Sequence, residues 1–171
     1  MTRTKGRPGR RRSAGLTLVE LMIAIAVLGI LATLAVPSLA ERLARQRLAS
    51  AAETLAMDLA EARVEAAASG QALHVVFDRG ADWCWAVARS ASCGCTAPAS
   101  CQLKVSRAAD WPGVDLLAAD ATAFEPGGVP EAGTRAQFRG RGSGHLLEVG
   151  LSPLGRSRLC TGSGMPGYVA C

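Results

Sequence analysis

Six cysteines are the side chains of this 171-residue chain with the clearest chemical capacity. Reduced cysteines bind zinc, whereas oxidised cysteines form disulfides, which persist outside the cytosol. Structural zinc sites use paired C-x-x-C units, and the chain has none, so zinc binding by the first four cysteines is the weaker alternative. We therefore expect disulfides, an exported domain and no bound metal. The cysteines are Cys84, Cys93, Cys95, Cys101, Cys160 and Cys171.

The spacing of the cysteines restricts their pairing without fixing it. Cys93 and Cys95 are separated by a single glycine, so a bond between them would be strained, and each is expected to pair elsewhere. Cys160 and Cys171 would close a glycine-rich loop at the C-terminus, and we favour that pair. The partners of the other four cysteines remain open, because spacing alone does not choose among the connectivities.

One carboxylate, Glu20, lies at the start of a long apolar run. No charged residue occurs from Leu21 to Val36, and the next charge along the chain is Glu41. An ionised carboxylate in an apolar environment must be paired or become protonated. A lone acid in a membrane-length helix usually marks a functional position, so Glu20 is a candidate site residue.

No group of residues predicts catalysis. The sequence contains no G-x-S-x-G elbow, no Walker loop and no H-E-x-x-H motif. His74 lies in an apolar, strand-like run, and His145 has no acid or cysteine at ligand spacing beside it. The three tryptophans, Trp83, Trp85 and Trp111, are expected in the core. We expect a protein that is not an enzyme and that needs no cofactor.

The elements that position these residues begin with one long helix. Residues 16–40 approach the roughly 20 apolar residues that span a bilayer, and Pro37 is expected to kink the helix rather than end it. Residues 41–70 are expected to continue it as an amphipathic helix that stops at Gly70. Its apolar positions recur at three- and four-residue steps: Leu39, Leu43, Leu48, Ala52, Leu55, Leu59, Ala62 and Ala66.

Residues 71–171 have the pattern of short strands broken by Gly, Pro and Asp. Gln71–Asp78 and Trp83–Arg89 form a predicted hairpin. Three later strands are predicted over Thr134–Arg139, His145–Leu151 and Arg156–Cys160. Residues 90–133 carry no clear pattern. The predicted fold class is α+β, with the long helix packed on an antiparallel sheet.

The charge distribution predicts the orientation of the chain in a membrane. The net charge is +5, but residues 1–15 hold six basic residues and no acid. Residues 16–171 therefore carry 13 basic and 14 acidic residues, a net charge of −1. Basic residues before an apolar segment hold that flank in the cytoplasm, so everything after Pro37 is expected outside it.

The run Gly15-Leu16-Thr17-Leu18-Val19-Glu20, after a basic leader and before an apolar helix, resembles the N-terminal signal of type IV prepilins and pseudopilins. The resemblance implies that prepilin peptidase removes residues 1–15 by cutting after Gly15, and that Leu16 is then N-methylated. It also implies that Glu20 pairs with the Leu16 amino group of a neighbouring subunit in a filament. Such families more often have phenylalanine at the position of Leu16. The implied protein is single-pass in the bacterial inner membrane, with a periplasmic type IV pilin-like domain that joins a filament or pilus tip.

A second resemblance lies near the C-terminus. Gly155-Arg156-Ser157-Arg158, followed by Cys160 and Cys171, is similar to the FimT branch of the GspH/FimT minor pilin family. This implies binding of duplex DNA for uptake through Arg156 and Arg158, which project to one face if they lie two apart on a strand. Guanidinium groups bind phosphate bidentately, without reading sequence. Arg139 and Arg141 are expected to extend the patch from the neighbouring hairpin. In the alternative interpretation these arginines only solvate an edge strand.

Three functions stay open on this basis. The favoured one is a minor pilin of a type IV pilus that binds DNA, and the second is a minor pseudopilin of a type II secretion system. The third is a soluble secreted protein that signal peptidase releases after Ala40. Glu20 and the continuous helix argue against the third, because a signal peptide gains nothing from a charge in its apolar region. Glu20 and the absence of a good cleavage context also disfavour a twin-arginine signal at residues 10–12.

Overall fold

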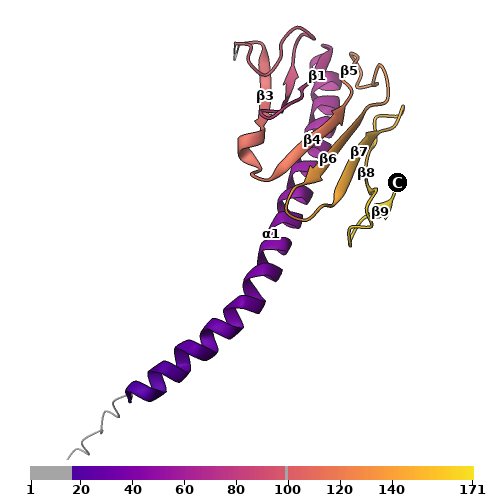
Figure 1. The fold of residues 1–171 in the computed structure, drawn as a ribbon. Coiled ribbons are helices and arrows are strands. Elements are labelled where there is room, and N and C mark those ends of the chain that lie inside the picture. Colours follow the sequence, from indigo (N-terminus) through magenta and orange to yellow (C-terminus); the bar gives the residue numbers. More distant parts are fainter. Residues whose placement is uncertain (1–16, 99) are drawn as a thin grey trace, which may run out of the picture. The chain divides into compact units, whose positions relative to one another are not determined.

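The computed structural model describes residues 17–98 and 100–171. The expected leader and the cleavage site between Gly15 and Leu16 lie outside the described residues. The chain divides into two compact units at the boundary between Ser38 and Leu39, and each unit is considered by itself. Figure 1 shows one long helix and a domain of β-strands.

The helix α1 spans Leu18–Ser69 and continues through Pro37, as the sequence predicted. It begins after Thr17, whose side-chain oxygen accepts a hydrogen bond from the Glu20 amide at 3.2 Å. This is an N-cap, which satisfies one of the amides that a helix start leaves free. The helix ends at Gly70, which adopts a φ of +64° and donates its amide to the Ala66 carbonyl at 3.1 Å. The predicted stop at Gly70 is confirmed.

The first sheet has the strand order β3-β2-β1-β5. β1 (Leu73–Asp78) and β2 (Cys84–Ala88) form an antiparallel hairpin with Val76 opposite Ala86. β3 (Gln102–Arg107) pairs with β2, and β5 (Thr122–Phe124) pairs with β1, both antiparallel. The hairpin agrees with the prediction, whereas β3 and β5 come from the stretch that the sequence left unassigned.

The second sheet has the order β4-β6-β7-β8-β9. Its strands are β4 (Val114–Ala119), β6 (Arg135–Gly140), β7 (Leu146–Leu151), β8 (Ser157–Thr161) and β9 (Val169–Ala170). Neighbours pair antiparallel except β8 and β9, which are parallel. A short 3-10 helix, Ala108–Asp110, precedes β4. The α+β class is therefore right, but the helix packs on two sheets rather than on one antiparallel sheet.

The core of the second unit is built where the buried face of α1 meets both sheets. Leu55 and Leu59 of α1 pack in one cluster with Val75 of the first sheet and Val149 of the second. Trp83 and Trp85 are completely buried, as predicted, with stacked rings whose centroids lie 5.7 Å apart. The partly buried Trp111 stacks on Trp85 at 5.1 Å. These large rings fill the space between the helix and the sheets.

The apolar stripe of the helix is only partly used by this core. Its members from Leu48 to Ala66 are buried, as their spacing predicted. Leu39 and Leu43, however, are 58% and 44% exposed. These two leucines belong to the predicted apolar stripe, but the core residues on α1 begin at Leu48.

Candidate assembly and binding sites

The segment of α1 from Leu18 to Ser38 is the most apolar surface of the chain that the structure describes. The large side chains whose exposure the structure describes here are at least half exposed, for example Leu18 at 74% and Leu28 at 67%. This part of the helix is long and apolar enough to cross a membrane. Glu20 is its one charged residue. An apolar helix with every face exposed requires lipid or other helices around it.

The geometry at Glu20 adds a local role that the sequence interpretation missed. Glu20 is the third residue of the helix, and its amide is bound by the Thr17 hydroxyl. Thr-x-x-Glu is the pattern of a capping box, and a carboxylate in the first turn is also favoured by the helix dipole. The Glu20 side chain is exposed. Thr17 therefore fixes the start of the helix and leaves the carboxylate available to a partner outside the chain.

Gly155 of the Gly-Arg-Ser-Arg motif lies in a tight turn between β7 and β8. The amide of Gly155 donates to the Ser152 carbonyl at 2.8 Å, and the amide of Arg156 donates to Ser152 Oγ at 3.1 Å. Gly155 has a φ of +73°, which favours glycine. From α1, the Arg63 guanidinium donates to the carbonyls of Gly128 at 3.1 Å and Gly155 at 3.3 Å. Arg63, which the sequence interpretation did not single out, thus ties two loops to the helix.

Arg156 and Arg158 are both exposed beyond this turn. Arg158 lies in β8 opposite Gly150, and neither arginine is ion-paired with a carboxylate of residues 17–98 or 100–171. On the side of β8 that faces away from β7, β9 pairs only with Cys160 and Thr161. The start of β8 is therefore an open edge with two free guanidinium groups.

Arg139 and Arg141 do not extend this patch. Arg139 pairs with Leu146 at the start of β7, whereas Arg158 pairs with Gly150 near the end of β7. At about 3.4 Å per residue, the two ends are roughly 14 Å apart along the strand. Arg139 and Arg141 also both bind Asp115, at 3.0 and 3.1 Å. The expectation of one four-arginine patch is wrong, since the two pairs lie at opposite ends of β7 and Asp115 offsets one of the two charges of the Arg139–Arg141 pair.

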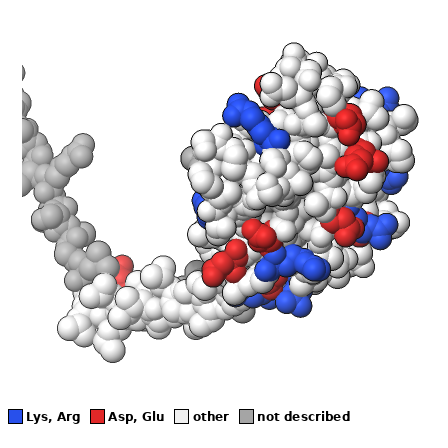
Figure 2. Space-filling view, turned by 90° about the horizontal axis from the view of Figure 1, so that it is seen from above, with Lys and Arg blue, Asp and Glu red and all other residues white. Residues whose placement is uncertain are grey.

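The charges on the face in Figure 2 are mixed, with acidic and basic side chains in neighbouring groups. No broad area of a single sign appears on that face. Electrostatic binding to nucleic acid normally uses a broad basic surface. The face in Figure 2 therefore offers no basic surface of that kind.

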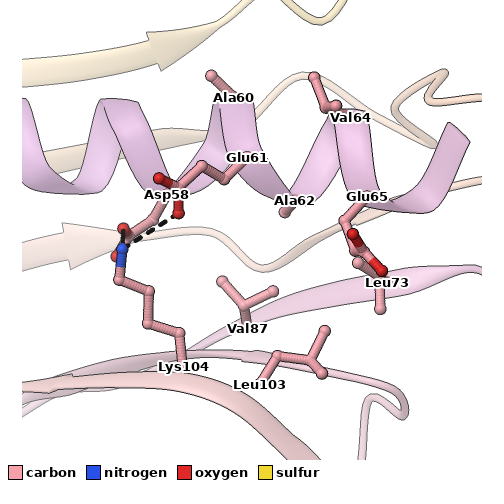
Figure 3. A pocket seen from close by; sticks show the side chains of 10 residues that line it. All are labelled: Asp58, Ala60, Glu61, Ala62, Val64, Glu65, Leu73, Val87, Leu103 and Lys104. Atoms are coloured by element: carbon pink, nitrogen blue, oxygen red, sulfur yellow. Dashed lines mark hydrogen bonds and ion pairs between the residues drawn. The ribbon is translucent and has the colours of Figure 1, made fainter. Parts of the chain in front are cut away.

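A buried acid, Asp58, joins α1 to the first sheet. Its side chain is fully buried, and Oδ2 accepts the Trp85 indole hydrogen at 2.7 Å. The Lys104 ammonium forms an ion pair with Oδ1 of Asp58 at 2.5 Å. The same ammonium lies 3.2 Å from the Glu61 carboxylate (Figure 3). Hydrogen bonding to Asp58 raises the pKa of Lys104 above its usual value, although desolvation acts in the opposite direction. The helical spacing gave no signal of this network, because Asp58 is not among the apolar positions that define the predicted helix face.

The network closes one end of a groove between α1 and the first sheet. The groove has a volume of about 630 Å³ and lies beside the edge strand β3. Apolar side chains from Leu73, Val87 and Leu103 form one wall, and Val64 and Glu65 contribute from α1 (Figure 3). Glu61 and Glu65 add carboxylates to this lining, and Lys104 adds an ammonium group.

The cysteines form three disulfides. Cys160 is bonded to Cys171, the pair that the sequence favoured, and this bond holds β9 beside β8. The other bonds are Cys84–Cys95 and Cys93–Cys101, so Cys93 and Cys95 pair outside their own unit. The sulfur atoms that a zinc site would need are therefore all bound to other sulfurs.

Two family models match the chain. Residues 10–36 match the prokaryotic N-terminal methylation motif, and residues 51–163 match type II transport protein GspH. The second match covers well over half of the sequence. No curated protein and no solved structure matches the chain. The methylation motif and the apolar helix fit a single-pass protein anchored in the inner membrane.

Proposed function

Because the chain belongs to the GspH family of type II transport proteins, we propose that it is a structural subunit of a pilus-like filament and not an enzyme. Prepilin peptidase cuts the chain after Gly15, and the new N-terminal residue, Leu16, is N-methylated. The helix first anchors the subunit in the inner membrane, with residues 41–171 in the periplasm. It then leaves the bilayer and packs with the helices of other pilins or pseudopilins.

The exposed apolar segment Leu18–Ser38 with Glu20 at its start is the observation that carries this proposal. Lipid tails surround the apolar side chains in the membrane, and neighbouring helices pack against them in a filament. Glu20 lacks a partner in either environment until it meets a cation. The α-amino group of Leu16 on a neighbouring subunit supplies one, and the pairing sets the axial register of the helices.

The match to type II transport protein GspH favours the pseudopilus of a type II secretion system as the machine. A type IV pilus is the alternative, because the methylation motif is compatible with both. Deleting the gene from its parent bacterium separates them. Loss of secreted enzymes from the medium supports the pseudopilus, whereas loss of pili or of transformation with intact secretion supports the pilus.

The role of Glu20 is testable by substitution. Glu20→Ala should be processed normally but fail to enter sheared filaments, because its carboxylate is needed for pairing between subunits. Glu131→Ala is the control, since Glu131 is also an exposed acid but lies outside the helix and its apolar segment. Equal assembly of both variants would show that Glu20 has no role beyond capping the helix.

DNA binding is a second candidate function, favoured by the two unpaired arginines at the open edge of β8. Guanidinium groups at this edge would contact phosphates in a salt-dependent and sequence-independent manner. Mobility shift of a duplex by the detergent-solubilised mature chain should disappear in Arg156→Ala/Arg158→Ala and persist in Arg139→Ala/Arg141→Ala. If the unmodified chain fails to shift DNA at low salt, the uptake function should be abandoned.

A further inference from the structure

Helix α1 within the second unit carries two segments of opposite charge. Residues 42–47 contain three basic residues and no acid, and residues 53–65 contain four acids and one arginine. The basic residues are Arg42, Arg45 and Arg47; the acids are Glu53, Glu61 and Glu65, which are exposed, and the buried Asp58. Such a division along one helix suits contact between two copies that are shifted relative to each other.

The basic segment and the residues just before it expose leucine and arginine side chains, although Leu43 and Arg47 also border Asp110 and Trp111 of their own domain. Leu39 and Leu43 are exposed, and Arg47 follows them at the same four-residue spacing, so all three share one side of the helix. Arg45 is paired with Glu41 at 3.8 Å. Arg42 and Arg47 form no ion pair with the carboxylates that the structure describes. The segment therefore offers leucines flanked by free guanidinium groups.

The groove beside β3 has the complementary character. Val64 and Leu103 line it while remaining 66% and 42% exposed, a large fraction for apolar side chains of a folded domain. Glu61 and Glu65, one helical turn apart, also line it. Lys104 is the one cation among the lining residues, and it is bound to the buried Asp58 as well as to Glu61. The groove thus combines open apolar surface with excess negative charge.

We propose that this groove receives residues 39–47 of a second copy of the chain. Leu43 of one copy contacts Val64 and Leu103 of the next, while Arg42 and Arg47 face Glu61 and Glu65. The inference rests on the proposed function, because subunits that enter a filament from one membrane have parallel helices. It adds a contact between exported segments that is separate from the contact at Glu20.

The proposal fixes an axial offset between the two copies. Placing Leu43 beside Glu61 of the neighbour shifts parallel helices by about 27 Å, at a rise of 1.5 Å per residue. The basic segment of the second copy leaves its own groove free for a third. The contact is therefore head-to-tail, which builds an open filament rather than a closed dimer.

Photo-crosslinking of the full-length chain in its native membrane tests this contact. Benzoylphenylalanine at Leu43 should yield a crosslink between two copies, with the attachment mapped by mass spectrometry to residues 60–65 or to Leu103. Arg47→Glu or Glu65→Arg alone should lower the yield by roughly threefold or more, because each change places like charges together. The combined Arg47→Glu/Glu65→Arg variant should restore the yield.

Arg79→Glu and Glu131→Arg are the matched controls, because both residues are exposed charges away from the groove. The proposal is overturned if the crosslink maps elsewhere, joins a different protein, or forms with lipid alone. It is also overturned if the charge reversals behave like the controls, or if the combined variant stays as low as the single ones.

Failure of this contact can be told apart from failure of the proposed function. A crosslinker at Ile23, in the apolar segment, reports on packing of the N-terminal helices. If Ile23 crosslinks copies or other pilins while Leu43 does not reach the groove, the chain is a filament subunit that lacks the proposed contact. If neither position crosslinks to a subunit, the filament function itself is wrong.

Discussion

Replacing Gly155 with alanine should destabilise the exported domain because two constraints meet at this residue. Its φ of +73° lies in the left-handed region, which disfavours any residue with a Cβ. A Cβ at this position would also lie 2.9 Å from Nε of Arg63. Arg63 must therefore move, and its hydrogen bonds to the Gly128 and Gly155 carbonyls are lost.

The left-handed backbone should contribute about 1–2 kcal/mol to the loss of stability. Losing the hydrogen bonds of Arg63 should add about 1 kcal/mol, because this exposed side chain exchanges protein partners for water. We expect the free energy of unfolding to fall by about 2–3 kcal/mol in total. Gly144→Ala is the matched control: its φ is +68°, but a Cβ added there would meet no atom within 4 Å, so only the backbone contribution applies.

Urea unfolding of residues 39–171, followed by tryptophan fluorescence, measures both effects, because the three tryptophans stack in the core. With Arg63→Ala as the background, Gly155→Ala should cost no more than Gly144→Ala does. The reasoning is refuted if the two glycine variants are equally destabilised while Arg63 is present. It is also refuted if the extra cost at Gly155 survives the removal of Arg63.

Two further outcomes concern the acidity of Tyr168 and the C-terminal disulfide. Burial, and then a 2.6 Å hydrogen bond to Glu53, raise the pKa of Tyr168 to about 12. The stability that the raised pKa of Tyr168 gives the fold is complete below pH 10 and is lost as the pH rises through 12. Absorbance at high pH measures the ionisation of Tyr168 directly, since it is the only tyrosine. Glu53→Gln should lower the midpoint pH of this ionisation. Removing the Cys160–Cys171 bond by a double alanine substitution should lower the free energy of unfolding by about 3 kcal/mol, and an unchanged urea midpoint would contradict this.

The periodic parts of the fold were predictable from the sequence. Residue spacing predicts the long helix and the β1–β2 hairpin. The positive φ that only glycine adopts readily predicts that the helix ends at Gly70. The burial of Trp83 and Trp85 was also predictable. β3, β4 and β5 were not predicted, because Ala, Gly and Pro obscure alternation in residues 90–133. Their pairing is set by long-range contacts that no local window contains.

The site residues likewise divide into those that a local sequence pattern identifies and those that only the folded structure identifies. Glu20, Arg156 and Arg158 could be identified from the sequence because a charge in an apolar run or after a glycine turn is a local pattern. Asp58 and Arg63 do not stand out, since a charged residue on an amphipathic helix is ordinarily solvated. Only the folded chain shows that Asp58 meets Trp85 and that Arg63 reaches Gly155.

The identity of the mature N-terminus tests the central claim most directly. Mass spectrometry of the protein isolated from its own membrane should show a chain that begins at N-methylated Leu16 and keeps the apolar helix. A Gly15→Leu variant should accumulate with its leader still attached, because the cleavage site is lost. A mature chain that begins at Glu41 would contradict the account, since the subunit would then lack both Glu20 and the segment that anchors it.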